Sequence, residues 1–150
     1  MATYALIPGG GGDPWEWHRL VPELERLGHE AIALRLPAED DENGWSEYAD
    51  AVVAALRGKK NVVLVAESLG GFTAPIVAAR RKVEQLVLLN AMIPKPGETG
   101  MAWGRNTRAS GARHRYYRRI MLSRAKAEDE AVSYYHDLPK ALAAEAKRRT

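Results

Sequence analysis

The segment Val-Val-Leu-Val-Ala-Glu-Ser-Leu-Gly-Gly, residues 62 to 71, places a serine where an apolar run meets two glycines. The apolar residues at its start do not alternate with polar ones, which is typical of a strand buried on both faces of a parallel sheet. A strand that turns into a helix with almost no loop forces one residue into strained backbone angles, and small neighbours make room for it. Ala66 and Gly70 are those neighbours, and the pattern predicts Ser68 as a nucleophile above the sheet edge. The same residues also fit a serine that only caps the following helix.

A second candidate element is the glycine loop at residues 9–12, which follows an apolar strand at 3–8. Glycines allow a backbone to approach a ligand closely, and an oxyanion needs two N–H donors. In this geometry the donors are the N–H groups of Gly10 and of Leu69, the residue after the serine. A dinucleotide phosphate is the alternative ligand, but the third glycine of that fingerprint is replaced by Pro14 or Trp15.

The elements that must position these groups alternate between strand and helix in the first part of the chain. Four apolar runs read as strands and three intervening stretches carry helical spacing, with Pro22 expected in the first turn of a short helix. Short connections between them imply a parallel sheet with right-handed crossovers. The strands are expected at 3–8, 31–36, 62–65 and 84–90. Helices are expected at 15–27, over the stretch of Tyr48, Val52, Val53 and Leu56 that stops before Gly58, and directly after Ser68.

Beyond residue 93 the sequence pattern no longer alternates between strand and helix. Prolines and glycines mark a loop as far as Gly104, and three helical stretches are then expected at 113–126, 128–136 and 139–149. Residues 101–150 carry a net charge of +7, against −4 for residues 1–100. Arginines with Tyr116 and Tyr117 among them could contact nucleic acid. Since Tyr117, Ile120, Met121 and Arg124 follow helical spacing, we expect packed aromatics, solvated arginines and no nucleic-acid partner.

The composition excludes several classes of chemistry. The chain has 150 residues and no cysteine, so disulfides, cysteine nucleophiles and thiolate metal sites are excluded. We expect neither a metal nor a cofactor. No apolar run approaches about 18 residues and no signal pattern opens the chain, which predicts a cytoplasmic protein without a membrane span.

Four stretches in series resemble the α/β-hydrolase superfamily, with the closest likeness to its small esterases and hydroxynitrile lyases. The resemblance implies an α/β three-layer sandwich with a mostly parallel sheet of about four strands, built as one domain with a β/α core at 1–93 and a helical cap-like segment at 94–150. It also implies serine-dependent hydrolysis of a small apolar ester, with Trp15, Trp17, Met92 and Trp103 as candidate lining residues. The matching stretches are IPGGGGDPWEWHRLVPEL (7–24), LGHEAIALRLP (27–37), VAESLGG (65–71) and LLNAMIP (88–94).

Departures from the family pattern concern the triad. Relatives carry two further strands after the cap, followed by the catalytic acid and histidine, so we expect a truncated domain. Without a base the Ser68 hydroxyl is a weak nucleophile. His136, beside Asp137 in the cap, is the candidate base, although the same residues fit a helix-to-helix junction. His18, His29 and His114 are expected to be structural or surface groups, and Glu67 a cap or sheet-edge group.

Two other hypotheses for the function stay open. The chain could be a binding module that keeps the serine turn and the glycine loop without turnover, or it could be a lyase. The strand at 84–90 would form a sheet edge, and exposed apolar edges recruit another chain. We therefore expect a homo-oligomer that pairs this edge, or cap helices that cover it.

Overall fold

A computed structural model describes residues 1–11, 13–123, 126 and 130–149. These residues form two compact units, Met1–Ile93 and Pro94–Thr150. The first unit holds a sheet of four strands in the order β2-β1-β3-β4, and every neighbouring pair is parallel. The parallel sheet predicted from the apolar runs is confirmed. The strands are β1 (Thr3–Ile7), β2 (Glu30–Ala33), β3 (Val62–Glu67) and β4 (Gln85–Leu89).

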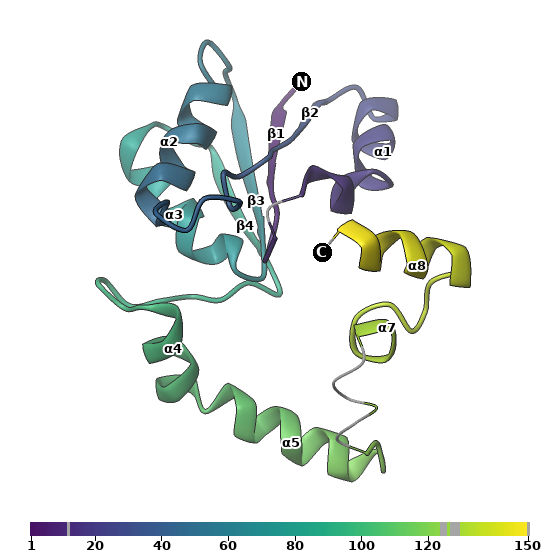
Figure 1. The fold of residues 1–150 in the computed structure, drawn as a ribbon. Helices are drawn as coiled ribbons and strands as arrows, with labels where there is room; N and C mark the ends of the chain where they lie inside the picture. The colour runs from purple at the N-terminus through teal and green to yellow at the C-terminus, as the bar shows by residue number, and fades with distance from the viewer. Residues whose placement is uncertain (12, 124–125, 127–129, 150) are drawn as a thin grey trace. The chain divides into compact units, whose positions relative to one another are not determined.

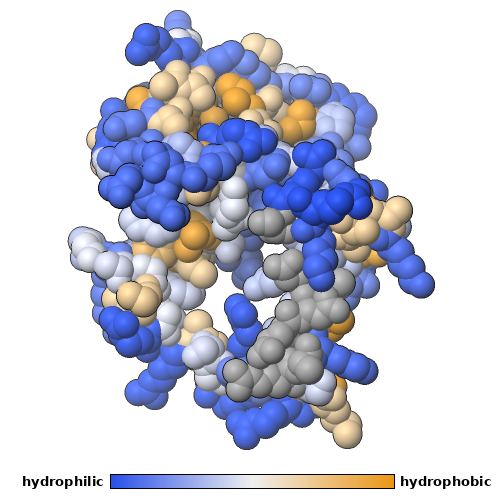
Figure 2. Space-filling view, viewed as in Figure 1, coloured by the Kyte–Doolittle hydropathy of each residue, from blue (hydrophilic) through white to orange (hydrophobic). Residues whose placement is uncertain are grey.

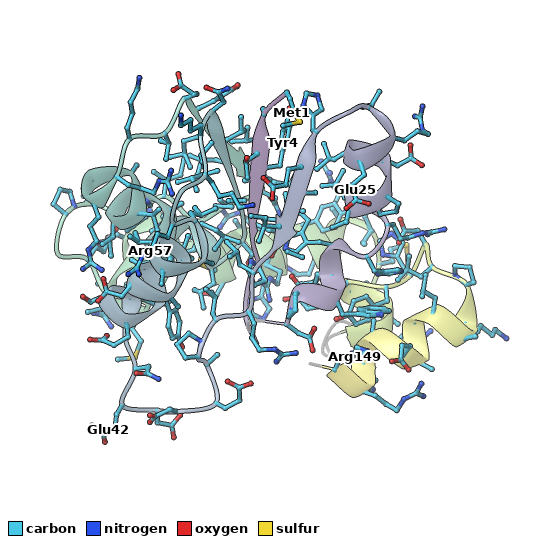
Figure 3. All side chains as sticks on the ribbon, turned by 90° about the horizontal axis from the view of Figure 1, so that it is seen from above. Met1, Tyr4, Glu25, Glu42, Arg57 and Arg149 are labelled. Atoms are coloured by element: carbon cyan, nitrogen blue, oxygen red, sulfur yellow. The ribbon has the colours of Figure 1, made fainter. Side chains whose placement is uncertain are left out.

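Helices cover both faces of this sheet (Figure 1). The 3-10 helix η1 (Pro14–Trp17) and α1 (Leu20–Arg26) lie on one face, and α2 (Trp45–Ala55) and α3 (Gly70–Arg80) lie on the other. In the view of Figure 3, Glu25 of α1 and Arg57 after α2 stand on opposite sides of the strands. The three-layer α/β architecture follows from the crossovers, because each helix returns the chain to the start of a parallel strand.

The core is divided between the two faces of the sheet by the alternation of side chains along the strands. Ala5 and Ile7 of β1 join the cluster under α2 and α3, whereas Leu6 joins the cluster under η1 and α1. Successive strand residues point to opposite faces, so a strand covered on both sides is apolar throughout. The five residues Val62 to Ala66 of β3 are all buried.

Two local details refine the sequence prediction. Pro22 occupies the first turn of α1, as expected, and Gly28 closes the turn after it with a φ of 80°. The predicted strand at 31–36 is shorter in the structure, where β2 ends at Ala33. Leu34 and Leu36 are nevertheless buried, at 4% and 3% exposed, because the chain continues over the core after it leaves the ladder.

The second unit consists of helices in its described residues. They are α4 (Gly100–Thr107), α5 (Ala109–Arg119), α7 (Glu130–Ser133) and α8 (Lys140–Arg149). The sequence prediction of a loop up to Gly104 was wrong: Thr99 caps α4, its hydroxyl accepting from the N–H of Ala102 at 3.2 Å. The predicted helix at 113–126 begins earlier and ends at Arg119. The start of the helix predicted at 128–136 lies outside the described residues.

The basic helix α5 does not bury the residues expected to pack. Ile120 is 47% and Met121 92% exposed, and Arg124 lies outside the described residues. Tyr116 lies under the Arg119 guanidinium at 5.5 Å from its ring centroid, and Tyr117 Oη lies 3.4 Å from Ser133 Oγ. Of the four residues whose helical spacing predicted this packing, only Tyr117 lies within α5, because the helix ends at Arg119 and Met121 has a φ of 56°.

Hydrophilic residues cover most of the face shown in Figure 2, and hydrophobic residues form separate small patches on it. Within the described ranges, no helix is both long and apolar enough to cross a bilayer.

Candidate functional site

The turn between β3 and α3 carries Ser68 in a strained conformation. Its φ is 44°, in the left-handed region that residues other than glycine seldom adopt. β3 ends at Glu67, and Leu69 already has helical angles as the N-cap of α3. The chain therefore passes from strand to helix through one residue, which confirms the strained turn predicted from the sequence and raises Ser68 above the carboxyl edge of the sheet.

The small residues of this turn are required by close backbone approaches. A Cβ on Gly70 would lie 2.8 Å from the carbonyl oxygen of Pro8, and a Cβ on Gly71 would overlap the carbonyl oxygen of Met92. The carbonyl of Ser68 accepts the N–H of Met92 at 2.8 Å. The segment after β4 is thus held against the start of α3, and both glycines are needed for that packing.

The glycine loop reaches the same place from β1. Gly9 is buried, and a Cβ on it would lie 3.1 Å from Ser68 Cβ and would overlap a carboxylate oxygen of Glu67. Gly10 is exposed, with no atom within 4 Å of its Cβ position. Gly12 lies outside the described residues. The structure brings the loop and the serine turn together, while the assignment of the Gly10 and Leu69 N–H groups to an oxyanion stays a prediction.

Two carboxyl groups flank Gly9. Glu16 Oε2 accepts the Gly9 N–H at 3.4 Å, and Glu67 reaches the other side of that residue. Burial raises the pKa of Glu67 to about 7, with a smaller contribution from the charge of Glu16. Burial also raises the pKa of Glu16, a rise opposed by the Gly9 N–H and supported by the charge of Asp13.

The carboxyl of Glu67 accepts no hydrogen bond within the part of the chain that the structure describes, so its charge has no local compensation. From the sequence, Glu67 was expected to be a cap or sheet-edge group, and no role was predicted for Glu16. No local signal connects two glutamates 51 positions apart, because only the fold brings η1 beside the end of β3.

The candidate lining residues do not all meet at this edge. Met92 is half-buried beside the serine turn, and Trp15 is half-buried and stacks on His18 with ring centroids 4.3 Å apart. Trp17 is instead a core residue, 4% exposed and packed with Leu6, Val63 and Val65. Its position on the inner side of η1 follows from the turn of that helix, which the sequence pattern did not specify.

Trp103 and His136 belong to the Pro94–Thr150 unit and are described within it alone. Trp103 is a half-buried residue of α4, and His136 is exposed in the turn between α7 and α8. Their predicted roles in substrate binding and as a base remain predictions.

The histidines of the first unit have structural partners. His18 Nδ1 lies 2.8 Å from the carbonyl oxygen of Trp15, and His29 Nδ1 accepts the N–H of Ala2 at the amino edge of the sheet. Among the described residues of 1–93, none hydrogen-bonds the Ser68 hydroxyl. Within the described chain no group of His, Asp and Glu side chains is arranged to hold a metal ion.

A strained serine turn at the carboxyl edge of a parallel sheet, faced by a glycine loop, defines the nucleophile elbow of serine hydrolases. The chain belongs to the alpha/beta hydrolase family, whose sequence model matches residues 5–150. The family membership inferred from the four matching stretches is thereby confirmed.

The relatives that the chain matches include esterases and a hydroxynitrile lyase. The chain is 33% identical over 106 residues to the (S)-hydroxynitrile lyase of Manihot esculenta, covering 62% of this chain and 41% of the relative. It is 29% identical over 105 residues to methyl jasmonate esterase 1 of Vitis vinifera, covering 62% and 40%. A solved variant of polyneuridine aldehyde esterase is 26% identical with a TM-score of 0.57, covering 65% of this chain and 43% of that one. The chain spans about two fifths of the length of the curated relatives it matches.

Proposed function

We propose that this chain carries the nucleophile half of a serine esterase that acts on a small, largely apolar ester. The observation that supports it most directly is Ser68, held at a φ of 44° between β3 and α3 with the glycine loop beside it. A serine backbone in the left-handed region of φ and ψ is unfavourable on its own, and strain of this kind persists where the surrounding structure imposes it. The relatives named as esterases agree with the proposed reaction class.

The proposed reaction has two displacements at the acyl carbon. Ser68 Oγ attacks that carbon while its proton passes to a base, and the negative carbonyl oxygen accepts the N–H groups of Gly10 and Leu69. The alcohol then leaves with a proton as the acyl–serine ester forms. Water attacks the acyl–serine ester in the second displacement, which releases the acid and restores the Ser68 hydroxyl. The positive end of the α3 dipole also favours the oxyanion.

His136 is the candidate base in this chain, since Asp137 beside it could orient the ring. Trp15 and Met92 supply apolar surface near the serine turn for the proposed substrate, and Trp103 is the candidate from the second unit.

The proposal is tested by the intact mass of the protein after exposure to a fluorophosphonate, which phosphonylates only activated serines. We expect one label per chain in the parent and none in Ser68→Ala, with Ser110→Ala as the matched control that keeps the label. His136→Ala should slow labelling if this histidine is the base. Circular dichroism verifies that each variant is folded.

A binding module without turnover is the second candidate, favoured by the absence of a described partner for the Ser68 hydroxyl within residues 1–93. A folded parent that takes up no label would overturn the esterase proposal and support this one. A lyase is distinguished by cleavage of a cyanohydrin without hydrolysis of p-nitrophenyl esters, a comparison prompted by the hydroxynitrile lyase relative.

A further inference from the structure

A pocket of about 450 Å³ lies at the end of α2, away from the serine turn. It is formed within the Met1–Ile93 unit by the last turns of α2, the loop that follows it and the residues just after α3. Volumes of this size accommodate small organic ligands. Its lining residues are Asp50, Val53, Ala54, Leu56, Arg57, Gly58, Arg81 and Lys82.

Positive charge gathers around this pocket although residues 1–100 carry a net charge of −4. The two loops at 57–61 and 80–84 contain six of the ten lysines and arginines in residues 1–100, against a single glutamate. Both loops precede parallel strands, β3 and β4, so they meet at the amino edge of the sheet. The charge is therefore concentrated by the fold at one place rather than spread along the chain.

Arg81 is held rigidly at the pocket by the end of α2. Its terminal nitrogens donate to the carbonyl oxygens of Leu56 at 2.5 Å and of Lys59 at 3.0 Å, while Nε donates to the carbonyl oxygen of Lys82 at 3.4 Å. These bonds compensate the partial negative charge that a helix C-terminus would otherwise present to an anion. A guanidinium has five N–H groups, so each terminal nitrogen keeps one N–H beyond these three bonds.

The remaining charges of the pocket favour an anion as well. Arg57 is exposed and has no ion pair among the described residues. Asp50, the single carboxylate of the lining, accepts from Arg80 Nη1 at 2.7 Å, and its side chain is 70% exposed, so water and that arginine screen its charge. Lys82 is exposed at 86% of its side chain, and its contact with Glu84 at 3.5 Å is a surface pair of little strength.

The other lining residues are apolar. Leu56 is fully buried, Val53 is half-buried, and Ala54 is exposed. Gly58, with a φ of 77° and no atom within 4 Å of its Cβ position, leaves the space above the loop open. We propose that this pocket binds a small amphiphilic carboxylate, whose head lies between Arg57 and Arg81 and whose short apolar chain covers Val53 and Ala54.

The test is a titration of the full chain, labelled with ¹⁵N, with sodium hexanoate at constant ionic strength. We expect saturable amide shifts at Ala54, Gly58 and Lys82, and an affinity at least fivefold higher than for acetate or for hexanol. Acetate lacks the apolar chain and hexanol lacks the charge, so the comparison measures both halves of the proposed ligand.

Variants assign the binding to the pocket. Arg57→Gln should weaken hexanoate binding about fivefold, as expected for the loss of one partly exposed charged contact. Arg19→Gln makes the same charge change on the other face of the sheet and should leave the affinity within twofold. Arg81 is left intact because its variants would also uncap α2.

Three results would overturn the proposal. If inorganic phosphate bound as tightly as hexanoate, the site would be a phosphate site. If hexanol bound as tightly as hexanoate, the pocket would be an apolar depression alone. If Arg57→Gln and Arg19→Gln lost the same amount of hexanoate affinity, the binding would be general charge attraction. The readout does not involve Ser68, so its outcome is independent of the esterase proposal.

Discussion

Glu67→Gln should remove a pH dependence from the stability of the first unit. Partial burial raises the pKa of Glu67 to about 7 in the folded protein, since its carboxyl has no hydrogen-bond partner among the described residues, and the nearby charge of Glu16 adds to the rise. The ordinary pKa of a glutamate side chain is 4.5. The folded state thus binds the proton more tightly than the unfolded chain, and glutamine replaces the carboxyl by a neutral group of similar shape.

The sign and size of the change in the free energy of unfolding follow from the difference in bound protons between the folded and unfolded states. Between pH 4.5 and 7 the folded state holds more protons than the unfolded state, so the free energy of unfolding falls as the pH rises. A shift of one pKa unit corresponds to about 1.4 kcal/mol, so the difference between 4.5 and about 7 sets an upper bound of about 3.4 kcal/mol. Since Glu67 is only half-buried, we expect a loss of about 2 kcal/mol between pH 4.5 and 8.5, absent in Glu67→Gln.

The assay is urea unfolding at a series of pH values in a Trp103→Phe background. Three tryptophans then remain, Trp15, Trp17 and Trp45, and all lie in residues 1–93, so fluorescence reports the first unit. The quantity of interest is the difference between parent and Glu67→Gln at pH 8.5 minus the same difference at pH 4.5. Effects of glutamine that do not depend on pH cancel in it.

Glu25→Gln makes the same change on α1 and controls for the loss of a negative charge. Parallel stability curves for the parent and Glu67→Gln from pH 4.5 to 8.5 would refute the reasoning, because they would show that burial does not keep this carboxyl protonated. A parent that gains stability relative to Glu67→Gln as the pH rises would refute it with the opposite sign.

Further substitutions test the packing, the buried hydroxyl groups and the sheet edge. Gly71→Ala crowds the backbone carbonyl that packs on this glycine and should lower the free energy of unfolding by about 2 to 3 kcal/mol, whereas Gly10→Ala, with open space at its Cβ, should change it little in the same urea assay. Thr73→Val should stabilise the protein by about 1 kcal/mol, since the Thr73 hydroxyl is fully buried without a partner in the described structure. Thr3→Val should have the opposite sign in calorimetry, because its hydroxyl donates to a carboxylate at 3.0 Å. We propose that β4, an edge among the described strands with Leu88 39% exposed, pairs two copies of the chain. Light scattering should then give a dimer for the parent and a monomer for Leu88→Lys, and a monomeric parent would contradict the pairing.

The sequence by itself determined the order and type of the elements in the first unit. Four apolar runs without alternation specify buried parallel strands, and the short connections between them specify crossovers. The small residues around Ser68 specify a turn that no larger side chain permits. These features are local, because each depends on the types and spacing of residues within about ten positions. The structure confirms the parallel strands and the turn, whereas burial of the outer strand β4 was wrong, since Leu88 and Leu89 are 39% and 49% exposed at the sheet edge.

Features that depend on how elements pack could not be predicted from local sequence patterns. Glycines at 100 and 104 marked a loop, whereas Thr99 caps a helix there. A tryptophan in a helical stretch can face the core or a ligand, and only the position of η1 against β1 and β3 buries Trp17.

The raised pKa of Glu67 and the grouping of Arg57 with Arg81 depend on the tertiary structure alone. Glu16 and Glu67 come together on the two sides of Gly9, because the chain runs from β1 through Gly9 to η1 while β1 pairs with β3. The pKa of Glu67 rises because burial at that place penalises its charge. Arg57 and Arg81, 24 positions apart, line one pocket because loops that precede parallel strands share an edge of the sheet. Residue type sets which charges a chain carries, but desolvation and the distance between charges are properties of the packed molecule.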